Sequence, residues 1–130
     1  MNFIFNDGGR KEAGYKGPAG DCAARAMAIA LNIPYKTAYC ELAKVNKDHG
    51  EAKSARNGVH NYIYSDVLKL HGWFWNPAPK FIGRGATCKD MPMGTVIARQ
   101  AEHNVTVVNG IPQDTWDSSE KMVFGFWDKK

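Results

Sequence analysis

The sequence predicts a single α+β domain in which helices come first and an antiparallel sheet follows. The chain has 130 residues, of which 44% are hydrophobic and 23% charged, values typical of one globular domain with one core. Apolar residues recur at helical spacing within residues 21–71 and alternate as in strands within residues 73–127. Because the two patterns are segregated rather than interleaved, an α+β architecture is favoured over an α/β one. We therefore expect one domain spanning residues 1–130.

Residues 1–20 are expected to form a loop-rich segment. They are rich in residues that interrupt regular structure, namely Gly8, Gly9, Gly14, Gly17, Pro18 and Gly20. Only residues 2–5 have the composition of a strand, and they are too few to form more than a short edge strand.

Three helices are predicted over residues 22–31, 35–45 and 59–71. Asp21 is an expected N-cap for the first helix, whose apolar positions form one stripe at Cys22, Ala26, Ile29 and Ala30. The second helix follows Pro34, which is favourable in a first turn. The third is expected to end at Gly72. The polar residues 46–58 between the last two helices are expected to form a loop or lid.

After Gly72 the sequence predicts strands over residues 73–75, 95–99, 103–108, 111–114 and 122–127. Asn109 and Gly110 lie between two of them and are the strongest short signal for a tight hairpin. These strands are expected to form an antiparallel meander.

Charge and hydropathy exclude several classes of function. The net charge is +4, but no run of five basic residues occurs, so the basic residues indicate a mixed-charge surface rather than a nucleic-acid interface. The longest apolar stretch, residues 26–31, is far shorter than the ~18 residues of a membrane span. The N-terminus lacks the basic region and cleavage site of a secretory signal. We expect a cytoplasmic protein, with binding to nucleic acid or membranes not favoured.

The three cysteines, Cys22, Cys40 and Cys88, include no CxxC pair. An odd number without this spacing predicts neither a disulfide framework nor a four-ligand zinc site. The four histidines also lack the spacing of zinc fingers or of the HExxH motif. We therefore expect no metal and no cofactor.

Cys22 is the cysteine whose position predicts reactivity. It begins the first predicted helix, where unpaired backbone N–H groups and the positive end of the helix dipole favour thiolate over thiol. Cys40 falls within a helix and Cys88 in a loop without an evident activating group. The alternative for Cys22 is a small, buried and inert core residue.

A nucleophilic thiolate needs a base, and the base needs a group that orients it. His103 begins a predicted strand, and Asp114 lies on the returning strand of the hairpin. If Asn109 and Gly110 are the two central turn residues, His103 is opposite Trp116 and Asp114 is opposite Val105. Asp114 is then one diagonal step from His103, close enough for a carboxylate–imidazole contact. The alternatives are an ordinary strand terminus for His103 and a turn or cap residue for Asp114.

Three segments resemble small phage-encoded proteins of the papain-like cysteine peptidase type: residues 20–26 (GDCAARA), 103–110 (HNVTVVNG) and 114–117 (DTWD). The order of Cys on a helix, His on a strand and Asp on the next strand is similar to that of bacteriocin-processing and related papain-fold peptidases. The resemblance covers roughly residues 17–127. It implies a papain-like fold, with Cys22 as nucleophile, His103 as general base and then acid, and Asp114 as the residue that orients the imidazole.

The sequence departs from this family at the oxyanion site. Papain-like enzymes usually carry a glutamine a few residues before the cysteine, and residues 14–19 contain none. The Cys22 backbone N–H is one expected donor, and Lys16, Tyr15 and Asn6 are candidates for the second. Loss of one oxyanion donor typically lowers turnover by ~10²–10³.

These features predict a thiol hydrolase that cleaves a peptide, isopeptide or side-chain amide bond through a thioester intermediate. Its partner would be a protein or peptide substrate, with a host protein as one candidate. Trp73 and Trp75, with the 46–58 loop, are candidates for a substrate groove, and core packing is the alternative for both tryptophans. The absence of the glutamine motivates a second hypothesis: a catalytically inactive papain-like module that binds and inhibits a host protein.

Overall fold

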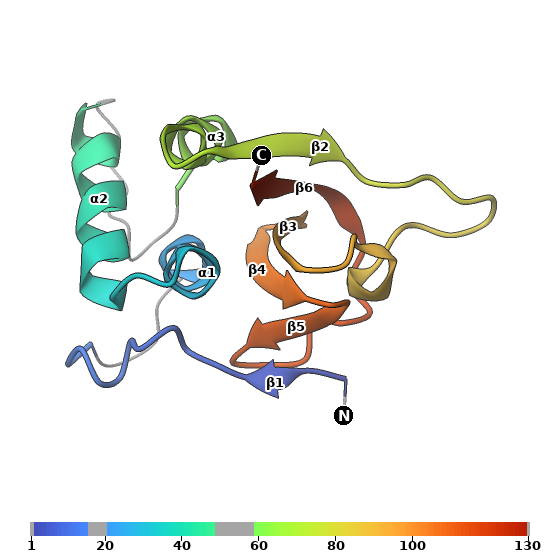
Figure 1. Ribbon diagram of the computed structural model, residues 1–130, viewed down its shortest axis with the longest axis horizontal. Helices are drawn as coiled ribbons and strands as arrows, with labels where there is room; N and C mark the ends of the chain where they lie inside the picture. Colours follow the sequence, from blue (N-terminus) through green and yellow to red (C-terminus); the bar gives the residue numbers. More distant parts are fainter. Residues whose placement is uncertain (1, 16–20, 49–58, 130) are drawn as a thin grey trace.

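The computed structural model describes residues 2–15, 21–48 and 59–129. Within these ranges, three helices pack on a six-stranded mixed sheet, so the α+β class is as predicted (Figure 1). The helices are α1 (Cys22–Leu31), α2 (Tyr35–Asp48) and α3 (Asn61–Leu70). The strands are β1 (Ile4–Phe5), β2 (Trp73–Pro77), β3 (Thr95–Gln100), β4 (His103–Val108), β5 (Ile111–Asp114) and β6 (Val123–Lys129).

The strand order is β1-β5-β4-β3-β6-β2. The strands of residues 73–127 pair antiparallel as predicted, but β2 lies beside β6 rather than β3, so they do not form a simple meander. β1 pairs in parallel with β5, whereas every other neighbouring pair is antiparallel. Tight hairpins impose antiparallel pairing on strands close in sequence. No such turn connects β1 to β5, so the N-terminal segment reaches this edge without that constraint.

The predicted hairpin between β4 and β5 is confirmed. Asn109 and Gly110 have φ values of 51° and 83°, the left-handed conformation that this two-residue turn requires. The strands pair Val108 with Ile111 and Thr106 with Gln113. This register, extended by one pair, places Asp114 opposite Val105 as the sequence predicts.

The sheet separates two hydrophobic clusters, because Ile97 belongs to one while its neighbours Val96 and Ala98 belong to the other. On one face α1 lies between α2 and the sheet, and the Thr106 hydroxyl donates to the Ala26 carbonyl oxygen across 2.6 Å. The other face curves around the connection that contains the short helix η2 (Cys88–Asp90). The site described below lies where the N-terminus of α1 meets the start of β4.

Two helix predictions need correction. The helix α1 was predicted to bury a single apolar stripe, but it is buried on more than one side. Ala23, Ala24 and Met27 lie outside that stripe and are buried, whereas Ile29 and Ala30 within it are only half-buried. Its small side chains allow α2 and the sheet to pack closely on different sides. The helix α2 continues to Asp48, so residues 46–48 are helical rather than part of a loop. The remainder of the predicted loop, residues 49–58, lies outside the described residues.

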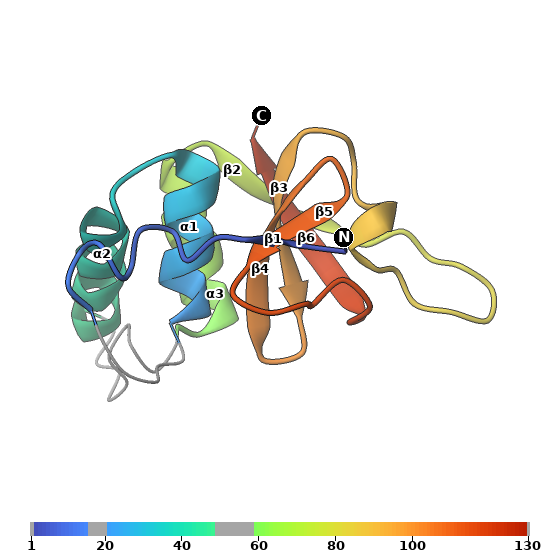
Figure 2. The ribbon, with the colours of Figure 1, turned by 90° about the horizontal axis from the view of Figure 1, so that it is seen from below.

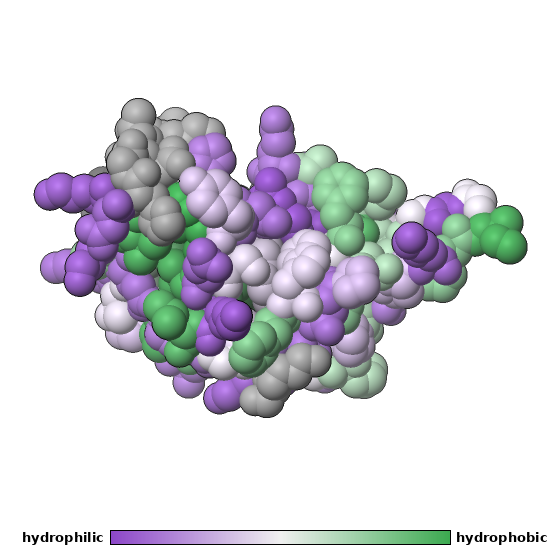
Figure 3. Space-filling view, turned by 90° about the horizontal axis from the view of Figure 1, so that it is seen from above, coloured by the Kyte–Doolittle hydropathy of each residue, from purple (hydrophilic) through white to green (hydrophobic). Residues whose placement is uncertain are grey.

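The segment between β2 and η2 projects away from the body of the molecule, as Figure 2 shows. Seen from above, hydrophobic side chains occur at its tip and on the neighbouring sheet surface (Figure 3). Exposed large apolar residues of these elements include Phe81, Ile82 and Phe124. No helix in the described part of the chain has the length and apolar character needed to cross a membrane.

Candidate active site

Cys22 is the first residue of α1, and its side chain is only partly exposed. The first turn of a helix leaves backbone N–H groups without intrahelical partners, and these groups stabilise a nearby negative charge. The thiol therefore lies where an anionic sulfur is favoured and is also accessible from solvent.

His103 begins β4 and is 5% exposed. Its Nε2 lies 2.7 Å from Oδ2 of Asp114, which follows the hairpin on β5. The two side chains share one face of the sheet because Asp114 is opposite Val105, two residues along β4 from His103. The hairpin register thus produces the contact that the sequence analysis expected.

The His103 imidazole also interacts with the Cys22 thiol, and the hydrogen-bond and charge contributions of this interaction lower the pKa of Cys22. Because Nε2 faces Asp114, Nδ1 is the ring nitrogen available to the sulfur. Burial opposes ionisation of Cys22, but the hydrogen bond and positive charge of His103 outweigh it. The backbone N–H of Asn104 and the Arg25 guanidinium act in the same direction, so the pKa of Cys22 is lowered.

The pKa of His103 shifts in the opposite sense. Burial by itself favours the neutral ring, but the hydrogen bonds to Asp114 and Cys22 outweigh it and raise the pKa. The pKa of Asp114 is lowered: burial opposes the charged form, and the interactions with His103, the Thr115 N–H and Arg25 exceed it. The shifts of Cys22 and His103 therefore both favour a thiolate beside an imidazolium, and the shift of Asp114 favours its carboxylate form.

Asp114 is held by three partners in addition to His103. Its Oδ1 accepts hydrogen bonds from the Thr115 backbone N–H at 2.7 Å and from Arg25 at 3.2 Å. Its Oδ2 accepts a hydrogen bond from the Ser118 hydroxyl at 3.0 Å. A buried carboxylate with this many donors has one orientation and is costly to protonate. Asp114 can therefore fix the ring plane of His103.

Asp21 occupies the N-cap position of α1, as predicted, but its side chain makes no capping hydrogen bond. The buried carboxylate instead contacts Arg10 at 2.9 Å, Arg25 at 3.2 Å and the Tyr35 hydroxyl. Burial, followed by the interaction with Asp21, raises the pKa of Tyr35, so this hydroxyl remains a donor. Arg25 consequently links the carboxylate beside the nucleophile to the carboxylate beside the imidazole.

Trp116 covers the imidazole from the side of the β5 strand end. Its ring centre lies 4.8 Å from that of His103, and the residue is 43% exposed. An aromatic ring over a buried imidazole excludes water from the His103–Asp114 hydrogen bond and so strengthens it. The hairpin register, which places Trp116 opposite His103, was the sequence signal for this contact. No comparable sequence signal existed for Arg25 or Ser118.

The four groups predicted as candidate oxyanion donors lie in different parts of the chain and differ in their contacts. The Cys22 backbone N–H lies at the site, whereas Lys16 lies outside the described residues.

The Tyr15 ring packs on the rings of Tyr35 and Tyr39, with centres 4.9 and 5.0 Å away. The Asn6 side-chain oxygen accepts the Gly8 N–H at 2.9 Å, which turns the chain after β1. These contacts involve the Tyr15 ring and the Asn6 side-chain oxygen rather than their donor groups, so the second oxyanion donor stays a prediction.

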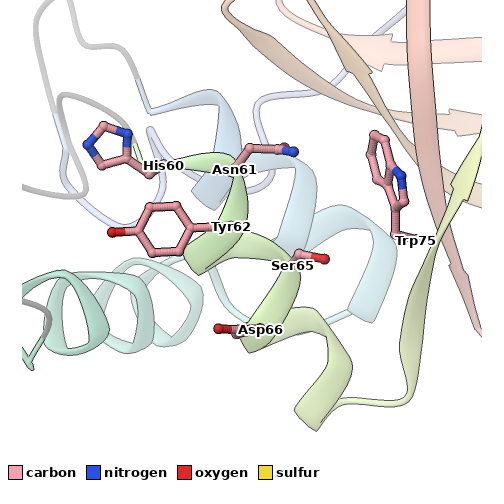
Figure 4. Close-up of a pocket in the computed structure, with 6 residues that line it drawn as sticks. All are labelled: His60, Asn61, Tyr62, Ser65, Asp66 and Trp75. Atoms are coloured by element: carbon pink, nitrogen blue, oxygen red, sulfur yellow. The ribbon is translucent and has the colours of Figure 1, made fainter.

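The two tryptophans predicted to line a substrate groove differ in their exposure to solvent. Trp73 is 5% exposed and belongs to the core beneath the helices. Trp75 is 41% exposed and faces α3 across a pocket of about 630 Å³. In Figure 4 the Asn61 and Ser65 side chains point from α3 toward Trp75. Only Trp75 is therefore placed to contact a bound molecule.

The other two cysteines lie in different environments. Cys40 is exposed on α2, and Cys88 is fully buried. Burial, followed by the negative charges of Asp114 and Asp117, raises the pKa of Cys88 to about 12. Among the described residues, no three His, Cys, Asp or Glu side chains group in a way that would hold a metal ion.

Comparisons with known proteins provide no family for the chain. No family model, no curated protein and no solved structure matches it.

Proposed function

We propose that this protein is a papain-like thiol hydrolase with Cys22 as nucleophile. The observation that supports the proposal most strongly is the continuous row of Cys22, His103 and Asp114, in which the imidazole interacts with both the thiol and a fully hydrogen-bonded buried carboxylate. A histidine with only a structural role does not require a low-pKa thiol on its other side.

In this proposal the Cys22 thiolate attacks the acyl carbon of an amide, and a C–S bond forms as the carbonyl π electrons move to oxygen. The resulting oxyanion is near the Cys22 backbone N–H. His103 then donates its proton to the leaving nitrogen, the C–N bond breaks and a thioester remains. Water attacks the thioester while His103 accepts a proton, and the thiolate leaves with its electron pair.

The substrate class in this proposal is a peptide, isopeptide or side-chain amide of a protein. The resemblance to small phage-encoded peptidases makes a protein of the host cytoplasm the first substrate to test. The alternative, an inactive papain-like module that binds and inhibits a host protein, is motivated by the missing glutamine before Cys22. The lowered pKa of Cys22 beside the raised pKa of His103 favours the hydrolase, because a binding module gains nothing from an activated thiol.

Trapping of the thioester tests the proposal. The full chain would be mixed with a peptide library, quenched in acid within seconds and analysed by intact mass spectrometry. We expect an acyl adduct that maps to Cys22 and new carboxyl termini in the peptides. A Cys40→Ala variant should give the same adduct, because Cys40 is distant in sequence and exposed on α2. A chain with unmodified Cys22 and no cleaved peptide would contradict the hydrolase and favour the binding module.

A further inference from the structure

Arg99 on β3 differs from the other arginines in the described part of the chain. Arg10, Arg25 and Arg84 each have a carboxylate within 4.0 Å, whereas Arg99 has none among the described residues. Its only hydrogen bond there runs from Nη1 to the Asn104 side-chain oxygen at 3.4 Å. Arg99 is also half-buried. A guanidinium without a carboxylate partner in the protein has hydrogen-bond donors that an anionic ligand can fill.

Arg99 lies on the face of the sheet that carries the helices and beside the nucleophile. It pairs across the strands with Asn104, the residue directly after His103. Ile97, two residues earlier on the same strand, belongs to the core under the helices. The Asn104 backbone N–H interacts with the Cys22 sulfur while its side chain interacts with Arg99. Cys22 and Arg99 therefore contact the same residue.

The contacts of Tyr64 on α3 also indicate that Arg99 lies close to Cys22. Its hydroxyl donates to the Ala23 carbonyl oxygen, one residue after Cys22, at 2.8 Å. Burial raises the pKa of Tyr64, a Cys22 thiolate raises it further and the positive charge of Arg99 lowers it. Both charges thus act on one buried hydroxyl.

Trp75 lies on the other side of Arg99. Arg99 pairs with Gly125 of β6, and a Cβ atom on Gly125 would lie only 2.2 Å from the Trp75 ring. The indole therefore occupies the surface directly above Gly125, the cross-strand neighbour of Arg99. The same indole forms one wall of the pocket beside α3 (Figure 4). Arg99 is accordingly linked to the nucleophile through Asn104 and to Trp75 through Gly125.

We propose that Arg99 is a specificity-determining residue that binds a carboxylate of the substrate, with the adjoining chain of the substrate lying against Trp75. This inference rests on the proposed hydrolase and adds its substrate class, an acidic peptide. The carboxylate belongs either to an aspartate or glutamate side chain near the scissile amide or to a peptide C-terminus. A guanidinium suits both sources because it binds carboxylates through two parallel hydrogen bonds.

The first test compares two alkylating reagents that differ in charge. In each, the Cys22 thiolate displaces iodide, and only iodoacetate carries a carboxylate. We expect Arg99→Gln to lower the iodoacetate-to-iodoacetamide rate ratio at Cys22 by about tenfold, equivalent to ~1.4 kcal/mol. Arg99→Lys keeps the charge but loses the paired hydrogen bonds, so it should give an intermediate ratio. Arg84→Gln, on the projecting segment, should not alter the ratio. An unchanged ratio in Arg99→Gln would overturn the proposal.

The same experiment separates this inference from the proposed function. If Cys22 reacts with iodoacetamide no faster than the exposed Cys40, the hydrolase proposal fails, while the ratio at Cys22 still reports the charge of Arg99. A second test uses a peptide library in which each member is present with a free and with an amidated C-terminus. We expect cleavage to favour acidic side chains, or free C-termini, in the wild type and to lose that preference in Arg99→Gln. An equal preference in both proteins would contradict the role of Arg99.

Discussion

Replacement of Cys22 by alanine should reduce amide hydrolysis by at least about 10⁴-fold, because the nucleophile and the thioester intermediate are both removed. The measurement is the rate of new carboxyl-terminus formation from a substrate found with the wild-type chain. The thiol is partly exposed and removal of one sulfur leaves little cavity, so the free energy of unfolding should change by less than about 2 kcal/mol.

Cys40→Ala is the matched control for this variant. It removes a thiol from the same chain at an exposed position on α2 and should retain wild-type turnover. Hydrolysis by a folded Cys22→Ala protein at the wild-type rate would exclude Cys22 as the nucleophile.

Asp114→Asn should lower turnover by about 10²–10⁴-fold. The substitution keeps the size of the side chain but removes the charge that stabilises the His103 imidazolium and pairs with Arg25. Asp117→Asn makes the same chemical change three residues away at an exposed position and should retain turnover. Equal turnover in the two variants would show that Asp114 does not orient the imidazole.

The pH profile of Asp114→Asn provides a second readout with a defined sign. Hydrolysis requires a deprotonated Cys22 and a protonated His103, so the rate rises through the pKa of Cys22 and falls through the pKa of His103. The hydrogen bond to Asp114 raises the pKa of His103. Without the carboxylate this pKa decreases, and the alkaline limb of the profile should move to lower pH. An alkaline limb that moves to higher pH would contradict this assignment.

Much of the fold could be predicted because its signals are local. The Asn109–Gly110 turn determines which residues of β4 and β5 are opposite one another, and the left-handed Gly72, with a φ of 83°, ends the region of helical spacing. The parallel pairing of β1 could not be predicted in this way. It depends on contacts between segments more than one hundred residues apart, such as the Asn6 N–H donating to the Asp114 carbonyl oxygen.

In the candidate site, too, the features that depend on local sequence could be predicted and those that depend on tertiary packing could not. The proximity of His103 and Asp114 follows from the register of one hairpin, and the position of Cys22 follows from the start of one helix. The role of Asp21 could not be predicted, because an aspartate before a helix usually caps it. Here Arg10, Arg25 and Tyr35 compete for the carboxylate. Their convergence depends on tertiary packing, and so does the position of Arg99 beside the nucleophile.

The rate of Cys22 alkylation by iodoacetamide as a function of pH, in the wild type and in His103→Ala, tests the central claim most directly. A thiolate–imidazolium pair predicts rapid alkylation that persists well below the ordinary thiol pKa of 9.0. In His103→Ala the burial of the sulfur is no longer opposed by the imidazolium, so this reactivity should shift to higher pH. A single titration near the ordinary thiol value, the same in both proteins, would contradict the account.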